Sequence, residues 1–361
     1  MTPTIPVRRL AAQRLVGPPF SDPVEVVRAL GAVQAQDYPG AKWALAQRTV
    51  GATDADLDRL FDAGAILRTH VLRPTWHLVD PADIRWLLAM TAPRVHAASA
   101  YQYRTLELDE AVIGRSADAM TRALAGGAHL TRAELKRVHE EAGIAADGLR
   151  LGYLMMHAEL DGLICSGARR EKQHTYALLD ERVPPTRPLA REAALGELAR
   201  RYVTGHGPAQ AADLAWWSGL TIAAAREALS LAEPCLARES VGDRTFWVSA
   251  DSARSGPPSD GPVVHLLPNY DELLIAFRDR TDATDPGLPA DARTSEALLA
   301  HIVVRDGLVV GGWRRAFGGQ SATVETDLLV WLDERERLAL EAAVGRLAAF
   351  LRRPVSLAGV D

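Results

Sequence analysis

The chain has 361 residues, enough for two or three domains, and its net charge is −5. It is 48% hydrophobic and 24% charged, which is ordinary for a globular protein. No apolar run is long enough for a membrane helix, and the N-terminal stretch lacks the apolar core of a signal peptide. Two cysteines, Cys165 and Cys235, are too few for a disulfide framework or a zinc site. We therefore expect a cytoplasmic protein with no membrane segment, metal or cofactor.

Arginine supplies nearly all of the positive charge. Lysine occurs only at Lys42, Lys136 and Lys172. A negative net charge does not exclude a basic face, because nucleic-acid binding depends on where the charge clusters. The planar guanidinium fork of arginine suits phosphate groups and base edges.

The first unit, residues 1–125, contains a pair of glutamines in the stretch "GAVQAQDYPG". Asp22 or Ser21 can cap a helix that has Pro23 in its first turn. Pro39 and Gly40 are expected to stop any helix, so Gln34 and Gln36 fall in a last helical turn or just past it. Short helices are expected around residues 42–49 and 54–64, strands over 66–79, and a helix over 80–101.

Two further units repeat the order helix, turn, helix, hairpin. In residues 126–185, Thr131 and Glu134 have the spacing of a capping box, and two strands over 163–179 enclose a basic turn. In residues 186–255, two helices flank Ser218-Gly219, which is the helix-turn-helix pattern, and two strands follow. This order is that of a winged helix.

The last unit, residues 256–361, differs from the others. Residues 262–277 and 297–317 read as strands, with a hairpin around Asp306-Gly307. A closing amphipathic helix is expected over residues 333–353. The predicted fold class is therefore α+β, with tandem winged-helix modules packed against a β-rich C-terminal part.

Several polar residues are candidates for DNA contact. Alternation along "LRPTWH" places Arg73, Thr75 and His77 on one strand face, where they either satisfy a strand edge or line a nucleic-acid cleft; His70 falls on the opposite face. The other candidates are the basic turn of the second unit (Arg169, Arg170 and Lys172) and the hairpin residues Trp313, Arg314 and Arg315. A basic hairpin end is also a common solvated surface.

Asp271 and Glu272 leave two readings open. Adjacent carboxylates can serve as an acid and a base. An acidic residue at a helix N-terminus can instead simply complement the helix dipole. The sequence offers no phosphate-binding glycine loop and no Ser-His-Asp or Cys-His arrangement.

Five stretches in order resemble the winged-helix DNA glycosylases of the AlkZ type. They are "QAQ" (34–36), "LRPTWHLV" (72–79), "GPAQAADLAWWSGL" (207–220), "LLPNYDELLIAFRDR" (266–280) and "DGLVVGGWRR" (306–315). The resemblance spans roughly residues 8–350. It implies tandem winged helices and a β-rich part that form a C-shaped clamp around duplex DNA.

The resemblance also implies catalytic residues and a substrate class. The family motif is Gln, an aliphatic residue, then Gln or Asp, and Gln34-Ala35-Gln36 matches its Gln-Gln version. Members with that version unhook bulky N7-alkylguanine adducts or interstrand crosslinks in antibiotic producers. Asp37 follows directly, so a shift by one residue would bring in a carboxylate. Lys42 is the nearby lysine to test for a lyase step.

The expected function is therefore a monofunctional DNA glycosylase for N7-alkylated guanine. Its expected partner is double-stranded DNA with alkylated purines, bound by a monomer. The alternative is a non-catalytic winged-helix transcriptional regulator, which would prefer one operator and usually form a symmetric dimer.

Overall fold

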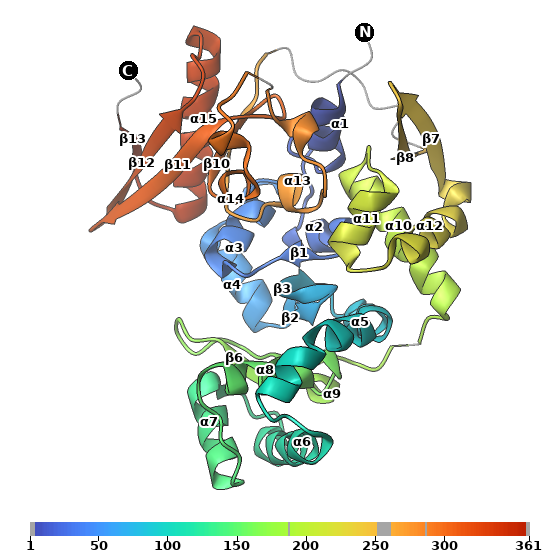
Figure 1. Cartoon of the computed structure of the whole chain (residues 1–361). Coiled ribbons are helices and arrows are strands. Elements are labelled where there is room, and N and C mark those ends of the chain that lie inside the picture. Colours follow the sequence, from blue (N-terminus) through green and yellow to red (C-terminus); the bar gives the residue numbers. More distant parts are fainter. Residues whose placement is uncertain (1–3, 187, 251–260, 286, 359–361) are drawn as a thin grey trace.

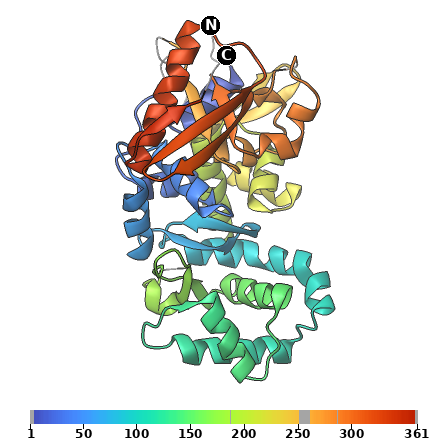
Figure 2. The same cartoon turned by 90° about the vertical axis from the view of Figure 1, so that its left-hand side faces the viewer.

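A computed structural model describes residues 4–186, 188–250, 261–285 and 287–358. Within these ranges the chain is a mixture of helices and four small sheets, which confirms the α+β class. No helix in the described ranges is long and apolar enough to cross a membrane. Figures 1 and 2 both place the second unit at one end of the molecule and the C-terminal sheet at the other.

The first unit is built around a three-stranded sheet in the order β1-β3-β2. Its strands are β1 (Val33–Gln34), β2 (Leu67–Val71) and β3 (Arg73–Val79), all paired antiparallel. Its helices are α1 (Ile5–Ala12), α2 (Pro23–Leu30), α3 (Tyr38–Ala46), α4 (Asp54–Asp62) and the long α5 (Ile84–Thr105). The strands predicted over residues 66–79 are confirmed.

The segment between α2 and α3 decides where the two glutamines lie. Asp22 caps α2 by accepting a 2.7 Å hydrogen bond from the Val24 N–H, and Gly31 ends the helix with a φ of 80°. The prediction that Pro39 stops a helix is wrong: it lies in the first turn of α3, where its missing N–H costs no helical hydrogen bond. Gln34 therefore lies on a strand, and Gln36 lies in the bend before α3.

The second and third units both show helices followed by a two-stranded hairpin. Helix α6 (Glu110–Leu124) falls at the end of residues 1–125, just before the second unit. The second unit has β4 (Leu130–Thr131), α7 (Arg132–Glu141), α8 (Gly148–Leu160), β5 (Ile164–Ser166), β6 (Thr175–Leu178) and α9 (Leu179–Arg182). The third has α10 (Arg191–His206), α11 (Ala211–Ser218), α12 (Ile222–Leu231), the 3-10 turn η1 (Glu233–Cys235), β7 (Leu236–Val241) and β8 (Arg244–Ser249). The capping box of Thr131 with Glu134 is confirmed. The expected boundary between residues 255 and 256 lies outside the described residues.

The C-terminal unit is a five-stranded sheet in the order β13-β12-β11-β10-β9, with α15 packed against it (Figure 1). Its strands are β9 (Val264–Leu267), β10 (Ile302–Arg305), β11 (Leu308–Gly318), β12 (Ser321–Leu328) and β13 (Val355–Leu357). Its helical segments are α13 (Glu272–Ile275), η3 (Thr281–Ala283), η4 (Asp291–Arg293), α14 (Ser295–Leu298) and α15 (Glu334–Leu351). The predicted strand over 262–277 is wrong beyond Leu267, because Asp271 caps α13 there.

The first sheet is covered on both faces. Val79 of β3 belongs to a core cluster that includes Tyr202 and Trp217 of the third unit. Leu78, which faces the other way, belongs to a second cluster with side chains from the C-terminal sheet and α15. Sheet β1-β3-β2 is thus wedged between the third and C-terminal units, and residues 33–36 lie at their junction.

Candidate active site

Gln34 connects the first sheet to the C-terminal unit. It lies directly opposite His77 on the neighbouring strand. Its backbone N–H donates to Glu272 Oε1 at 2.9 Å, and its side chain is almost fully buried. Opposed residues on antiparallel strands project from the same face of a sheet. The side chains of Gln34 and His77 therefore share the face that carries Val79.

Glu272 is an anchor for this strand and not an exposed acid. Its Oε2 accepts hydrogen bonds from Trp217 Nε1 at 3.0 Å and from His206 Nε2 at 3.1 Å, while Oε1 accepts from Gln34. A buried carboxylate is tolerated only when it is hydrogen-bonded in this way. Its neighbour Asp271 pairs with buried Arg48 through two hydrogen bonds, of 2.7 and 3.0 Å. These contacts favour the structural reading of the adjacent carboxylates.

A row of unsatisfied polar atoms runs along the face shared by Gln34 and His77. Thr69 of β2 lies opposite His77, which puts three side chains in register across the three strands. Thr75 and Arg73 follow on the same face of β3. The buried atoms without a hydrogen-bond partner in the described residues are Gln34 Oε1, Thr69 Oγ1, Arg73 Nε and Nη2, Thr75 Oγ1 and His77 Nε2.

Exposure rises along this row from the inside outward. His77 is fully buried, whereas Thr75 and Arg73 are partly exposed. Buried polar groups are normally satisfied, by ordered water where protein offers no partner. The row is therefore a concentration of unpaired polar atoms next to Gln34.

The protonation state of His77 is fixed by its surroundings. Burial, and then the nearby charge of Arg73, lower the pKa of His77 to about 3. The ring is therefore neutral at physiological pH. Its Nδ1 lies 3.0 Å from the Thr75 carbonyl oxygen, so Nδ1 carries the proton and donates it. Nε2 is left as an acceptor, like Gln34 Oε1.

Gln36 lies on the outside of the same turn. It is exposed, whereas Ala35 is fully buried. The Ala35 N–H donates to the Trp76 carbonyl at 2.7 Å, and the Ala35 carbonyl accepts from Arg68 Nε at 3.0 Å. Ala35, the small middle residue of the motif, is thus hydrogen-bonded through both its N–H and its carbonyl oxygen. Gln34 is therefore buried and Gln36 is exposed, although only two residues separate them.

Asp37 and Lys42 follow the Gln-Ala-Gln motif in the chain, and their surroundings differ. Asp37 is the N-cap residue of α3, is partly exposed, and makes no side-chain cap hydrogen bond. Lys42 is buried, and its Nζ lies 2.7 Å from the carboxylates of both Asp54 and Asp58. An ammonium held between two carboxylates is a poor nucleophile.

The basic turn of the second unit is largely neutralised within the chain. Arg169 pairs with Asp58 at 2.8 Å and with Asp62 at 3.0 Å. Arg170 pairs with Glu134 at 2.7 Å. Lys172 is exposed.

The three candidate residues for DNA contact on the β11–β12 hairpin differ in exposure. Trp313 is buried and donates from its indole Nε1 to the Leu267 carbonyl at 2.7 Å, so it supports the hairpin from inside. Arg314 is exposed and hydrogen-bonds to Glu325 at 2.6 Å. Arg315 is partly buried, and burial lowers its pKa. Its guanidinium lies 5.3 Å from the ring of Phe317, an exposed aromatic residue that the sequence analysis did not single out.

Two further residues near Gln34 were missed from sequence. Thr69 stands at the inward position of the strand alternation, and this parity could have revealed it. His206 is the last residue of α10, and no pattern in the sequence marks it as a neighbour of Gln34.

One cluster among the described residues has the donor set of a metal site. His96 of α5 and His157 of α8 both contact Asp161, each at 3.1 Å. The second ring nitrogen of His96 lies 2.9 Å from the Tyr103 hydroxyl. These contacts also explain the cluster as a polar link between α5 and α8. It belongs to neither Gln34 nor the polar row.

Comparisons with known proteins identify the family of this chain. The family model described as "DNA glycosylase AlkZ-like" matches residues 27–350. No curated protein matches the sequence significantly. Among solved structures, the chain is similar to the Streptomyces sahachiroi DNA glycosylase AlkZ, with a TM-score of 0.75, 21% identity and 98% of each chain covered. At that identity the match shows a shared fold. Because the family model covers most of its length, the chain belongs to the AlkZ-like DNA glycosylase family.

Proposed function

We propose that this chain is a monofunctional DNA glycosylase that hydrolyses the N-glycosidic bond of N7-alkylated guanine. The observation that carries the proposal is the unpartnered amide oxygen of Gln34, in register with the acceptor Nε2 of His77. Gln34 and Gln36 are the proposed catalytic pair. Their amides hold a water against the sugar carbon C1′ and stabilise the positive charge that develops there.

The chemistry of the departing base explains why two glutamine amides are enough for the proposed catalysis. An N7-alkylated guanine is cationic, so its glycosidic bond is already weakened and the base departs as a neutral molecule without an added proton. The enzyme then has to position a water and to stabilise an oxocarbenium-like sugar. Glutamine supplies a carbonyl acceptor for the water and N–H donors that fix its own position. An unmodified base leaves far less readily, which makes a mild catalyst selective.

The proposed DNA-binding surface combines several elements of the fold. The first three units act as winged helices, and with the C-terminal sheet they form a C-shaped clamp around the duplex. Arg73, Thr75 and His77 line the approach to Gln34. The second-unit turn and the β11–β12 hairpin offer further contacts; these are Arg169, Arg170, Lys172, Trp313, Arg314 and Arg315. Arg169, Arg170 and Arg314 are ion-paired within the chain, and Trp313 is buried. Lys172 and Arg315 are therefore the strongest of these candidates for DNA contact.

The Gln-Ala-Gln motif points to bulky substrates. In the resemblance described above, the Gln-Gln version accompanies enzymes that unhook large adducts or interstrand crosslinks for self-resistance. We extend that role to this chain, which acts as a monomer. A lyase step is not part of the proposal, because Lys42 is held by two carboxylates.

Base release from defined duplexes tests this function. Parent protein is incubated with duplexes that carry N7-methylguanine, a bulky N7 adduct or an N7 interstrand crosslink, and abasic sites are read as alkali-labile strand breaks. Release from at least one duplex, and none from undamaged DNA, supports the glycosylase. If nothing is released and one undamaged sequence binds far more tightly than random DNA, the chain is a regulator instead.

A further inference from the structure

Two histidines and one aspartate meet where helix α5 packs against helix α8 (Figure 1). His96 lies on α5, His157 lies on α8, and Asp161 is the C-cap residue of α8. His157 and Asp161 are four residues apart, and side chains at that spacing share one face of a helix. One ligand atom from each residue lies within 4.8 Å of the other two. The three therefore form one compact group of nitrogen and oxygen ligands, which is a type of set that binds zinc.

The distances within this group suit a shared ion. The His96 Nε2 lies 3.1 Å from Asp161 Oδ1, and the His157 Nδ1 lies 3.1 Å from Asp161 Oδ2. The two ring centres are 4.5 Å apart. Ligand atoms that each lie about 2.0–2.1 Å from a tetrahedral ion are about 3.3 Å from one another. Each imidazole nitrogen is thus already near the spacing from the carboxylate that coordination requires.

One of these two contacts lacks the direction of a hydrogen bond. The His157 Nδ1 atom is buried and has no hydrogen-bond partner among the described residues, although the Asp161 carboxylate is 3.1 Å away. A buried polar atom without a partner is costly. Ligands of one ion point at the ion and not at each other, so a cation between the ring and the carboxylate would satisfy this nitrogen. The His96 contact is a hydrogen bond, which the same cation would replace.

Tyr103 supports His96 through the other ring nitrogen. Its hydroxyl lies 2.9 Å from His96 Nδ1. Burial raises the pKa of Tyr103 to about 12, so the phenol keeps its proton at physiological pH and can donate or accept. When an ion occupies Nε2, Nδ1 carries the ring proton and donates it to the phenol oxygen. Histidines that ligate metals are usually oriented by such a bond from their second nitrogen.

A cavity of about 350 Å³ opens beside the three side chains. His96 and Asp161 line it, together with apolar side chains that include Leu160. Arg85 also lines the cavity, and its charge is paired with Asp180 at 2.8 Å. The Asp161 side chain is half-exposed, so water reaches the group. There is therefore space for a water molecule as a fourth ligand, which zinc sites with three protein ligands use.

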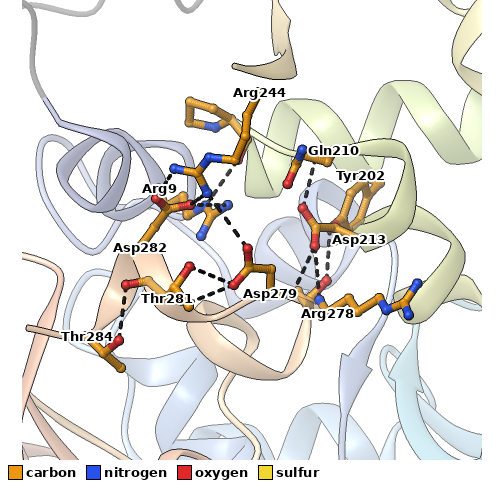
Figure 3. Close-up of polar contacts among 12 residues, drawn as sticks. Arg9, Tyr202, Gln210, Asp213, Arg244, Arg278, Asp279, Thr281, Asp282 and Thr284 are labelled. Carbon is orange, nitrogen blue, oxygen red and sulfur yellow. Dashed lines mark hydrogen bonds and ion pairs between the residues drawn. The ribbon is translucent and has the colours of Figure 1, made fainter. Parts of the chain in front are cut away.

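A charged cluster between α1, α11, β8 and η3 has partners of a different kind (Figure 3). Asp282 lies between Arg9 and Arg244, with contacts of 3.7 and 2.6 Å, and Asp213 accepts hydrogen bonds from backbone N–H groups. Guanidinium and backbone N–H groups are donors and offer no lone pair to a metal. Asp161 is instead flanked by two imidazoles, each of which can present a lone pair. This difference in partners distinguishes a metal site from a network of ion pairs.

We propose that His96, His157 and Asp161 bind one zinc-type divalent ion, with water as its fourth ligand. Calcium and magnesium are disfavoured as occupants because they prefer oxygen ligands. Helix α5 belongs to the first unit and α8 to the second, so the bound ion fastens one unit to the other. The expectation of no metal considered only the cysteines, and this site uses none. The proposal does not involve Gln34 and is independent of the proposed function.

Zinc binding by the full chain tests the site. Metal-free protein, checked for folding by circular dichroism, is titrated with Zn²⁺ against a chromophoric indicator at neutral pH. The parent should bind one ion per chain, and His157→Ala and Asp161→Asn should each lose that binding. Tyr103→Phe should keep the stoichiometry and weaken binding about 10–100-fold, as expected when the group that orients a ligand is removed. Cys235→Ser is the control, because the exposed Cys235 thiol could bind zinc by itself.

Hydrogen exchange tests what the ion does. Zn²⁺ should slow amide exchange in α5 and α8 of the parent and leave α12 of the third unit unchanged. Unchanged exchange in α5 and α8 would reject the fastening of the two units.

Three results would overturn the site itself. They are a parent that binds no zinc, an unchanged zinc affinity in either His157→Ala or Asp161→Asn, and a loss of zinc binding in Cys235→Ser. The cluster would then be only a polar link between the two helices. Base release enters none of these measurements, so failure of the proposed glycosylase would leave their result unaffected.

Discussion

Gln34 and His77 face each other across β1 and β3, and each ends in a buried acceptor atom that no described group satisfies. In the proposed reaction, the donor to both acceptors is the attacking water. Thr69 and Thr75 lie on the same face with hydroxyl groups that can donate or accept. The proposed catalytic role of the first sheet depends on these side chains.

The rate of base release should not depend on the ionisation of His77. Because burial and Arg73 lower the pKa of His77 to about 3, the ring stays neutral from weakly acidic to weakly basic pH. A single-turnover pH profile should therefore be flat across that range. A rise in rate centred near the ordinary histidine pKa of about 6.5 would show instead that a histidine acts as a titrating base.

Stability should fall as the solution is acidified below neutral pH. His77 and His265 are both buried, with pKa values lowered to about 3, whereas an unfolded histidine titrates near 6.5. Between those values the unfolded state binds more protons, so each residue lowers the free energy of unfolding by up to about 1.4 kcal/mol for each unit of falling pH. Urea unfolding at a series of pH values measures this slope. His77→Gln should lower it by one histidine's share, and an unchanged slope would contradict the assignment.

No covalent intermediate should form with Lys42. Its Nζ lies 2.7 Å from carboxylate oxygens of both Asp54 and Asp58, so these two contacts hold the amine away from an attack on a sugar carbon. Borohydride added during turnover should trap no protein–DNA adduct, and Lys42→Ala should still release base if it folds. A trapped adduct that disappears in Lys42→Ala would establish a lyase step.

Asp271 should matter for folding. Removing one partner of a buried ion pair costs about 3–5 kcal/mol, and Asp271→Ala would leave Arg48 unpaired and α13 without its cap. Glu227→Ala, which breaks a solvent-exposed pair with Arg191, should have a much smaller effect on the free energy of unfolding. Urea unfolding compares the two. Equal losses would mean that the buried pair is not a structural anchor.

Local rules in the sequence anticipate much of the fold. The caps at Asp22 and Thr131, the break at Gly219 and the strands over 66–79 each depend on short-range chemistry, and each is present. Pro39 shows the limit of such rules, because a proline stops a helix or begins one depending on which residues pack around it.

The site is less predictable because it depends on contacts between distant segments. Strand alternation correctly groups Arg73, Thr75 and His77 on one face. It gives no indication that Glu272 holds the Gln34 backbone, or that Trp217 and His206 hold Glu272 in turn. Nor does it reveal that Arg169 and Arg170, which look like a DNA-binding wing, are paired with acidic residues of the chain itself. These facts appear only when the units are packed together.

Single-turnover base release from a duplex with one N7-methylguanine, compared for the parent, Gln34→Ala and Gln36→Ala, tests the central claim most directly. The parent should release the base, and Gln34→Ala should slow release by about 100-fold or more, as expected when a preorganised polar group is lost. Binding to the same duplex should change little, because Gln34 is almost fully buried. Gln36→Ala should also lose activity. Equal rates for the parent and both variants would contradict the assignment of this motif.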